Sequence, residues 1–271
     1  MKAPPGRLVL LGHPVAHSLS PRFQNAALRA AGISINYEAL DVPPADLPRT
    51  LDGLRSIAGA GNVTVPHKRA VAAQCDELTA LARRAEAVNT FWCEDGRLIG
   101  DNTDVGGFQA AVIELLAGSK TSRPRTIAVL GAGGAGAAVL AAIEQWPEAR
   151  ARVFSRSLRR ADALCARFAD VARAVSSAEE AVRGADLVVN ATPIGLADGH
   201  MPVDPRHLEE GTAVLDLVYG RGGTPWTRAA ERLGLRARDG TGMLIEQGAL
   251  AFERWFGVSP DRAVMREALP R

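Results

Sequence analysis

One lysine stands out as a residue that could do chemistry. Lys68 closes the segment Gly-Asn-Val-Thr-Val-Pro-His-Lys, in which several other polar side chains lie. An enzyme that oxidises or reduces an alcohol needs a proton donor near the oxygen on which charge develops, and an ammonium group can fill that role. Lys68 is therefore the first candidate for a catalytic group. Taken alone, a lysine at such a position is more often a solvated helix residue.

Other polar residues gather where predicted strands end. Hydroxyl groups of a ligand need several donors and acceptors, and a carboxylate needs cations or a cluster of neutral donors, so together they would suit a small anionic polyol. Capping is the competing interpretation, because Asp104 could cap a helix that starts at Val105 and the two serines could cap the helix after Pro21. The residues are Ser18, Ser20, Asn62, Thr64, His67, Asn89, Asn102, Thr103, Asp104, Tyr219 and Gln247.

A glycine fingerprint marks a second region. The β-rich run Thr126–Leu130 leads into Gly131, Gly133 and Gly136, and an Ala-rich helical pattern follows from Ala135. This is G-x-G-x-x-G with a strand before it and a helix after it, which is the context that the motif requires. Its glycines allow a tight turn and a close approach of the backbone, so a pyrophosphate can bind at the helix N-terminus.

The next predicted strand, Ala151–Ser155, decides which dinucleotide is expected. NAD-binding sites usually place an acidic residue here, on the ribose 2′-hydroxyl. This chain has Ser155, Arg156 and Ser157 instead, with Arg160 close behind. A guanidinium can bind a 2′-phosphate bidentately, so we predict NADP as the cofactor. The alternative is a solvated, basic helix start.

Composition limits the class of protein. The 271 residues are 47% hydrophobic and 23% charged, an ordinary globular balance, and the net charge of +2 is too small to suggest a nucleic-acid or membrane partner. The apolar stretch Leu8–Leu11 is too short for a signal peptide. Cys75, Cys93 and Cys165 are odd in number and widely spaced, which favours reduced thiols, a cytoplasmic location and no metal site.

Strand-like and helix-like patterns alternate along the chain, which predicts an α/β fold with largely parallel sheets and two lobes with a ligand cleft between them. We expect a substrate domain over 1–104, a Rossmann-type domain over 105–238, and a C-terminal helical segment over 239–271 that packs back on the first domain. A polar linker at 118–124 is expected just before the nucleotide-binding strand. The expected strands are Arg7–Leu11, Ile35–Leu40, Gly61–Val65, Ala87–Glu94, Arg97–Gly100, Thr126–Leu130, Ala151–Ser155, Leu187–Asn190 and Ala213–Val218. The expected helices are Pro21–Ala31, Leu47–Ser56, His67–Cys75, Val105–Leu116, Ala135–Trp146 and Met243–Phe256.

Eight segments in register resemble the shikimate dehydrogenase family over essentially the whole chain. They are HSLSP, GNVTVPHK, AVNT, GDNTD, GAGGAG, NATPIG, DLVY and MLIEQGALAFERW. The resemblance implies an NADP-dependent, reversible reduction of 3-dehydroshikimate to shikimate, a step of aromatic amino acid biosynthesis. It implies a small-molecule substrate and no nucleic-acid or membrane partner, and leaves a monomer and a homodimer open.

The resemblance also implies roles for individual residues. Lys68 and Asp104 would form the catalytic pair, and Asn89 and Gln247 would bind the substrate ring. Ser18 and Ser20 would hold the substrate carboxylate, with Thr64 and Tyr219 close to it. The cofactor-binding residues would be Gly131, Ala132, Gly133, Gly134, Ala135, Ser155, Arg156, Ser157, Arg160, Thr192, Val218, Gly240 and Met243.

The chain departs from the family pattern at Gln24, where a His is usual, and at Ser155, where an Asn is usual. The change at Gln24 is expected to affect packing. Three alternatives stay open: a quinate/shikimate dehydrogenase, a dehydrogenase of an aminoshikimate, and an NADP-binding sensor without turnover. Arg156 argues against an NAD-dependent quinate enzyme, and the presence of both Lys68 and Asp104 argues against a sensor.

Overall fold

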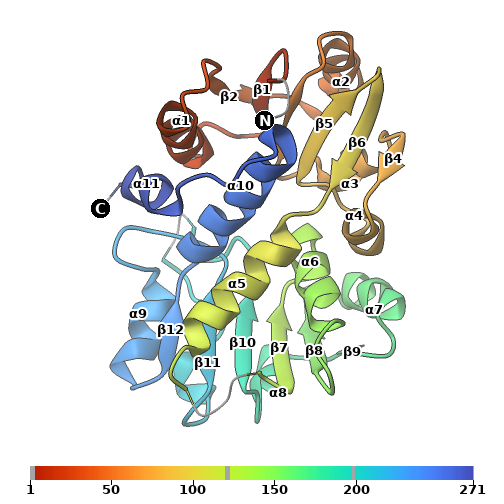
Figure 1. Cartoon of the computed structure of the whole chain (residues 1–271). Coiled ribbons are helices and arrows are strands. Elements are labelled where there is room, and N and C mark those ends of the chain that lie inside the picture. Colours follow the sequence, from red (N-terminus) through yellow and green to blue (C-terminus); the bar gives the residue numbers. More distant parts are fainter. Residues whose placement is uncertain (1–3, 120–122, 197–198, 271) are drawn as a thin grey trace. The chain divides into compact units, whose positions relative to one another are not determined.

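The computed structural model describes residues 4–119, 123–196 and 199–270, and these form two compact units (Figure 1). The first unit comprises the chain up to Gly107 and again from Leu244, and the second runs from Phe108 to Met243. The chain changes unit inside helix α5 (Asp104–Leu116) and inside helix α10 (Thr241–Phe256). The division after residues 104 and 238 that we expected stays a prediction.

A six-stranded mixed sheet forms the centre of the first unit. Its strand order is β2-β1-β3-β5-β6-β4, and β5 runs antiparallel to both of its neighbours. The reason is the predicted hairpin, whose turn residues Asp95 and Gly96 both have positive φ, as a type I′ turn requires. The strands are β1 (Leu8–Gly12), β2 (Tyr37–Asp41), β3 (Ala60–Val63), β4 (Glu77–Leu78), β5 (Thr90–Glu94) and β6 (Arg97–Asp101).

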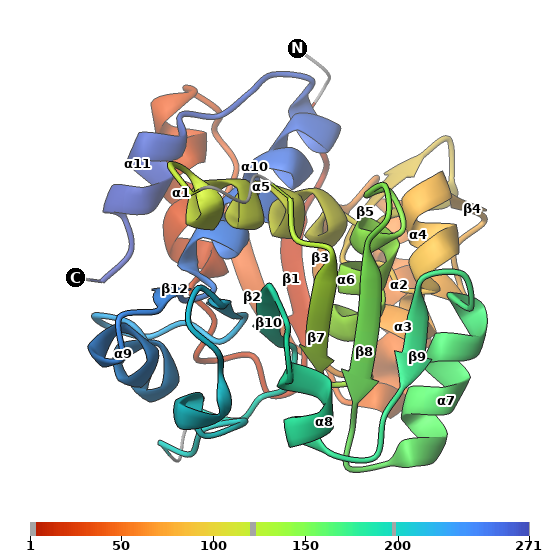
Figure 2. The same ribbon diagram turned by 90° about the horizontal axis from the view of Figure 1, so that it is seen from below.

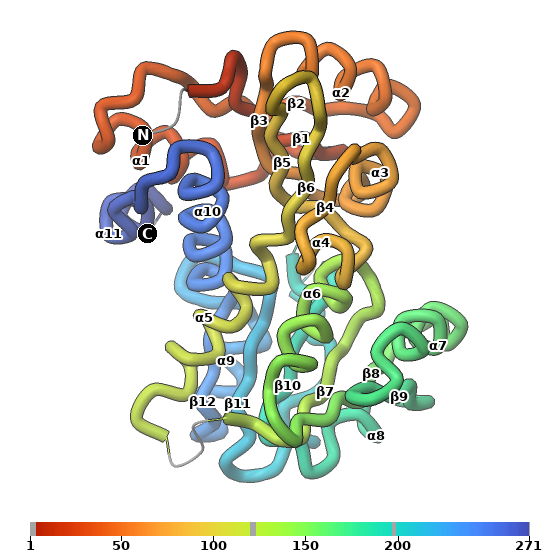
Figure 3. Tube along the Cα trace, turned by 45° about the vertical axis from the view of Figure 1, so that its right-hand side comes forward, coloured from red at the N-terminus to blue at the C-terminus, as the bar shows by residue number. Residues whose placement is uncertain are grey.

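Both faces of this sheet are covered, and β1 shows how. Side chains of a strand alternate between faces. Leu8 and Leu10 therefore pack with apolar residues of α1, α10 and α11, whereas Val9 and Leu11 pack with residues of α2, α3 and α4 (Figure 3). The helices are α1 (Ser20–Ala30), α2 (Leu47–Ser56), α3 (Lys68–Ala72), α4 (Ala80–Ala85) and α11 (Arg262–Glu267), with a 3₁₀ turn at Pro44–Asp46.

The second unit has a six-stranded sheet in which all strands are parallel. Its order, β12-β11-β10-β7-β8-β9, is that of the dinucleotide-binding doubly wound fold, with β7 and β10 at the switch point (Figure 2). The strands are β7 (Thr126–Leu130), β8 (Arg150–Phe154), β9 (Ala172–Ala174), β10 (Leu187–Asn190), β11 (Ala213–Asp216) and β12 (Arg236–Arg238). The helices are α6 (Gly134–Ile143), α7 (Leu158–Arg167), α8 (Ala178–Val182) and α9 (Pro225–Arg232), with a 3₁₀ turn at Pro205–His207.

The α/β class and the Rossmann-type fold are confirmed, and the C-terminal residues from Leu244 do belong with the first unit. The prediction of largely parallel sheets is also confirmed, and the antiparallel pairing of β5 with β6 is the predicted hairpin. The ranges of helices α4, α7, α8, α9 and α11 were not predicted, and of these α4, α8 and α11 are short. Of the predicted linker at 118–124, residues 120–122 lie outside the described residues. No helix in the described part of the chain combines the length and the apolar character that crossing a membrane demands.

Gly61 allows β3 to lie between its neighbours, and this can be tested. A Cβ atom at this position would lie 2.0 Å from the backbone oxygen of Val9. We expect Gly61→Ala to lower the free energy of unfolding by about 1–3 kcal/mol, because the strands must move apart. Gly53→Ala is the control, since a Cβ there meets nothing within 4 Å in helix α2, and it should stabilise by up to about 1 kcal/mol. Equal effects of both variants in urea unfolding would contradict this account.

Candidate active site

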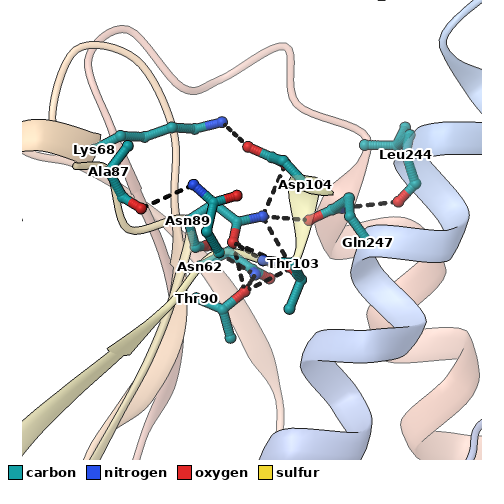
Figure 4. A network of polar contacts seen from close by, with 10 residues as sticks. Asn62, Lys68, Ala87, Asn89, Thr90, Thr103, Asp104, Leu244 and Gln247 are labelled. Atoms are coloured by element: carbon teal, nitrogen blue, oxygen red, sulfur yellow. Dashed lines mark hydrogen bonds and ion pairs between the residues drawn. The ribbon is translucent and has the colours of Figure 1, made fainter. Parts of the chain in front are cut away.

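Lys68 and Asp104 form an ion pair in the first unit (Figure 4). Lys68 begins α3 and Asp104 begins α5, and Lys68 Nζ lies 2.6 Å from Asp104 Oδ2. Their side chains are only 18% and 8% exposed. The structure therefore brings together the two residues that the resemblance named as a pair. Asp104 also lies in the first turn of α5, where a negative charge is favourable.

Asn89 holds the other oxygen of Asp104. Its Nδ2 donates to Asp104 Oδ1 at 2.8 Å and to Gln247 Oε1 at 3.2 Å. Its Oδ1 accepts from the backbone N–H of Thr103 at 2.7 Å. Because a backbone N–H can only donate, this last bond determines which way the amide faces, and the Nδ2 group must point towards the carboxylate.

A second layer of polar residues lies beneath Asn89. Tyr37 Oη donates to Asn62 Oδ1 at 2.8 Å, and Asn62 Nδ2 donates to Thr90 Oγ1 at 3.0 Å. Thr90 Oγ1 in turn donates to Asn89 Oδ1 at 3.1 Å. Burial raises the pKa of Tyr37 well above its usual value, so its hydroxyl stays protonated and able to donate. This hydrogen-bonded series leads from β2 to the carboxylate of Asp104.

Tyr37 and Thr90 were missed in the sequence, and the reason is physical. Each is the first residue of a strand, where a tyrosine or threonine usually contributes only to packing. Their hydroxyl groups matter here because the strand order places β3 between β1 and β5. Nothing in the local sequence carries that information.

Ser18 and Ser20 lie at the start of helix α1, and Thr64 directly follows strand β3. Ser18 Oγ accepts the N–H of Ser20 at 3.2 Å, but the N-cap residue of α1 is Leu19, without a side-chain cap hydrogen bond, so neither serine is the N-cap that the competing interpretation required. Ser20 is buried, and its Oγ has no partner within the described residues. Thr64 follows β3, and its N–H donates to the oxygen of Leu11. None of the three forms a hydrogen bond with Lys68 or Asp104 in the described part of the chain.

Gln24 packs between α1 and α10, as expected. It is fully buried, and its Nε2 donates to the oxygen of Gly248 at 2.9 Å. His67, also buried, contacts the oxygen of Val42 through Nε2 at 2.7 Å. Both side chains are thus engaged in holding the elements around the ion pair.

The glycine turn of the second unit fits a pyrophosphate. Gly131 has φ +122°, and a Cβ there would lie 2.7 Å from Ala191 O. A Cβ at Gly136 would lie 2.4 Å from Gly131 O, whereas one at Gly133 would meet nothing within 4 Å. Helix α6 starts after Gly133 without a side-chain cap, so its first N–H groups can bind an anion. Ala132, Gly134 and Ala135 complete this turn.

The arginines after β8 lie around the N-terminus of helix α7, which a serine caps. Ser157 is the N-cap of α7 and accepts the N–H of Arg160 at 3.4 Å, and Ser155 Oγ accepts the N–H of Ser157 at 3.4 Å. Arg156 and Arg160 are exposed. Their guanidinium groups are therefore accessible to a phosphate at the carboxyl end of β8, although exposure alone also suits a solvated helix start.

The carboxyl ends of β10 and β11 carry the remaining predicted residues. Thr192 donates from N and Oγ1 to Asn190 Oδ1, at 3.0 and 2.6 Å. Val218 O accepts the N–H of Gly240 at 2.9 Å. Strand β11 ends at Asp216, two residues earlier than predicted, so Tyr219 lies in the following loop. Met243 is buried near the start of α10.

Known proteins similar to this chain share its full length. Residues 10–91 match the sequence model of the shikimate dehydrogenase substrate binding domain, and residues 240–269 that of the shikimate 5′-dehydrogenase C-terminal domain. A shikimate dehydrogenase (NADP(+)) of Rubrobacter xylanophilus is 44% identical over 96% of this chain and 94% of its own.

Two solved structures are also similar. The shikimate 5-dehydrogenase of Thermus thermophilus, in complex with NADP(H) and shikimate, is 41% identical, with 97% of both chains covered and a TM-score of 0.87. The quinate dehydrogenase of Corynebacterium glutamicum, in complex with NAD, is 32% identical, with 96% of this chain and 97% of that chain covered and a TM-score of 0.87.

The layer beneath Asn89 can be tested through its outermost member. We expect Tyr37→Phe to destabilise the protein by about 1–3 kcal/mol, because it leaves the buried Asn62 Oδ1 without a donor. Urea unfolding followed by circular dichroism measures the change. Ser56→Ala removes an exposed hydroxyl that bonds Gly53 O, and it should cost less than about 0.5 kcal/mol. A Tyr37→Phe protein as stable as the Ser56→Ala control would contradict this role.

Proposed function

The chain belongs to the shikimate dehydrogenase family, and we propose that it interconverts shikimate and 3-dehydroshikimate with NADP as its cofactor, a step of aromatic amino acid biosynthesis. The observation that carries the proposal is the partly buried ion pair of Lys68 and Asp104, hydrogen-bonded to Asn89. A lysine held in this way can exchange a proton with the ligand oxygen that gains or loses charge.

Proton movement in this reaction is assigned to Lys68. When bound, NADP supplies the hydride chemistry: the carbon that bears the reacting hydroxyl loses a hydride in the oxidising direction and gains one in the reducing direction. In the reducing direction, the Lys68 ammonium donates a proton to the ketone oxygen and stabilises its developing negative charge. In the oxidising direction, neutral Lys68 accepts the hydroxyl proton. Asp104 keeps the Nζ atom in place through the 2.6 Å contact.

The substrate is held by neighbouring polar groups of the first unit. Asn89 and Gln247, already hydrogen-bonded to each other, bind the ring hydroxyls. Ser18 and Ser20 bind the carboxylate at the start of α1, with Thr64 close to it. Neutral donors can hold a carboxylate when several converge on it.

The cofactor is held by the carboxyl edge of the parallel sheet. Gly131 to Ala135 bind the pyrophosphate at the start of α6, and Arg156 and Arg160 bind the 2′-phosphate together with Ser155 and Ser157. Thr192, Val218 and Gly240, which follow β10, β11 and β12, and Met243 near the start of α10 are assigned to the nicotinamide. The free thiols of Cys75, Cys93 and Cys165 support the cytoplasmic location that we propose. A monomer or a homodimer both fit this proposal.

The direct test is a progress curve of NADPH formation with shikimate and NADP⁺. We expect turnover with this pair, and markedly less with quinate or with NAD⁺. Turnover that prefers quinate and NAD⁺ would favour the activity named for the similar Corynebacterium enzyme. Tight NADP binding without any turnover would favour a sensor.

Lys68→Ala tests the proton-transfer role. We expect kcat to fall by roughly 10²–10⁴-fold, the usual cost of losing a positioned proton-transfer group, with almost no change in the Kd of NADP⁺. Arg69→Ala, at the neighbouring exposed residue, should leave kcat unchanged. Undiminished turnover of a correctly folded Lys68→Ala protein would exclude Lys68 from the mechanism.

Arg156→Ala tests the choice of dinucleotide. Loss of one charged hydrogen-bonding contact should weaken NADP⁺ binding by about 10–100-fold and leave NAD⁺ binding unchanged, because NAD⁺ has no 2′-phosphate. Calorimetric titration with both dinucleotides measures this, with Arg125→Ala as the control at an exposed arginine of the same unit. Equal losses for both dinucleotides would refute the 2′-phosphate assignment.

A further inference from the structure

A buried carboxylate ends strand β11 and has no part in the mechanism described above. Asp216 is fully buried and is paired in the sheet with Asn190, the last residue of β10. Asn190 Nδ2 donates to Asp216 Oδ1 at 2.8 Å, and the N–H of Val218 donates to the same oxygen at 3.1 Å. Thr224 Oγ1 donates to Oδ2 at 2.7 Å.

All three of these bonds come from neutral donors. In the described part of the chain, no lysine or arginine forms an ion pair with Asp216, and the nearby charge that acts on it is the negative one of Asp239. Burial raises the pKa of Asp216, while the three donors oppose that shift by stabilising the ionised form. A buried charge without a countercharge is costly, and a ligand cation would offset that cost.

The strand order indicates which part of a bound dinucleotide lies nearest to Asp216. In the doubly wound sheet, one mononucleotide-binding half consists of β7, β8 and β9, and the other consists of β10, β11 and β12. The candidate 2′-phosphate arginines follow β8, so the first half takes the adenosine part. The carboxyl ends of β10 and β11 then face the nicotinamide part.

The nicotinamide ring changes its charge during the reaction. It is cationic in NADP⁺ and neutral in NADPH, so a fixed negative charge near it interacts favourably with the oxidised form only. We propose that Asp216 is a positioning residue whose negative charge, at the carboxyl ends of β10 and β11, favours binding of NADP⁺ over NADPH. The inference rests on the proposed function, because it assumes that this unit binds the nicotinamide dinucleotide.

The same carboxylate joins the loops that follow both strands. Through Asn190 it reaches Thr192, and through its own bonds it holds Val218 and the N-cap residue of α9, Thr224. A purely structural role would therefore also affect nucleotide binding. The two roles differ in one respect: disturbed loops weaken both forms of the cofactor, whereas a lost charge weakens one form.

Asp216→Asn separates the roles, because asparagine has the shape of aspartate without its charge. Its Oδ1 can still accept from Asn190 and Val218, and its Nδ2 can donate to Thr224 Oγ1. The Kd values of NADP⁺ and NADPH are measured by calorimetry without substrate. We expect the ratio of the Kd of NADP⁺ to that of NADPH to rise by about 3- to 30-fold, because a poorly screened charge attracts only the oxidised form. An unchanged ratio would overturn the proposal.

Asp216→Glu is the matched control, because it keeps the negative charge while its longer side chain disturbs the same hydrogen bonds to Asn190, Val218 and Thr224. It should change both Kd values by the same factor. A change of the ratio as large as that in Asp216→Asn would show that disturbed loops suffice, and would overturn the role of the charge.

If Asp216→Asn does not fold, Asp216→Ser is the second variant, because it also removes the charge and leaves a short polar side chain at this position. It should raise the ratio by a similar factor, and an unchanged ratio would again overturn the proposal. The two proposals fail in different ways. A wild-type protein that binds neither NADP⁺ nor NADPH refutes both the proposed function and the role of Asp216. A wild-type protein that turns over shikimate, combined with variants whose Kd ratio is unaltered, refutes only the role of Asp216.

Discussion

The polar contacts of the first unit depend on one ion pair and on the hydrogen bonds that it requires. Lys68 and Asp104 lie 2.6 Å apart and are largely withdrawn from water, so each remaining lone pair or proton needs a partner. Asn89 meets this demand for Asp104, and the backbone N–H of Thr103 fixes the direction of the Asn89 amide. The hydroxyl groups of Thr90 and Tyr37 extend the same network into the sheet, with Asn62 between them. The proton-transfer group, Lys68, is thereby held by Asp104, whose position is fixed by this hydrogen-bonded network.

In the second unit, the loops at the strand ends are positioned by the backbone geometry of a glycine turn and by one buried carboxylate. Gly131 and Gly136 bring the turn after β7 close to its neighbours, and the start of α6 keeps its N–H groups for an anion. At the adjacent strand ends, Asp216 draws three neutral donors towards itself and joins the loops after β10 and β11. The parallel sheet collects these features because all of its strands end at the same edge.

Much of the fold could be predicted because its signals are local. The strand Thr126–Leu130 and the helix Leu47–Ser56 were predicted with their observed bounds, since each is a clear apolar period with a turn at its end. The hairpin at Asp95-Gly96 follows from turn chemistry. The short helices α4 and α11 carry too few residues for a period to show. The direction of β5 follows from the hairpin, yet its pairing with β3 depends on the whole sheet.

The sequence by itself determined the residue types that the chemistry needs, the glycine turn and the arginines after β8, because these depend on short spacings along the chain. It also determined the family, through segments spread over the full length. Only the tertiary structure decided that Tyr37, Thr90 and Gln247 join one network around Asn89, and that Asp216 is buried without a cation. The physical reason is that hydrogen bonds and desolvation act between residues brought together by sheet order and helix packing, and Asn89 and Gln247 are 158 positions apart in the chain.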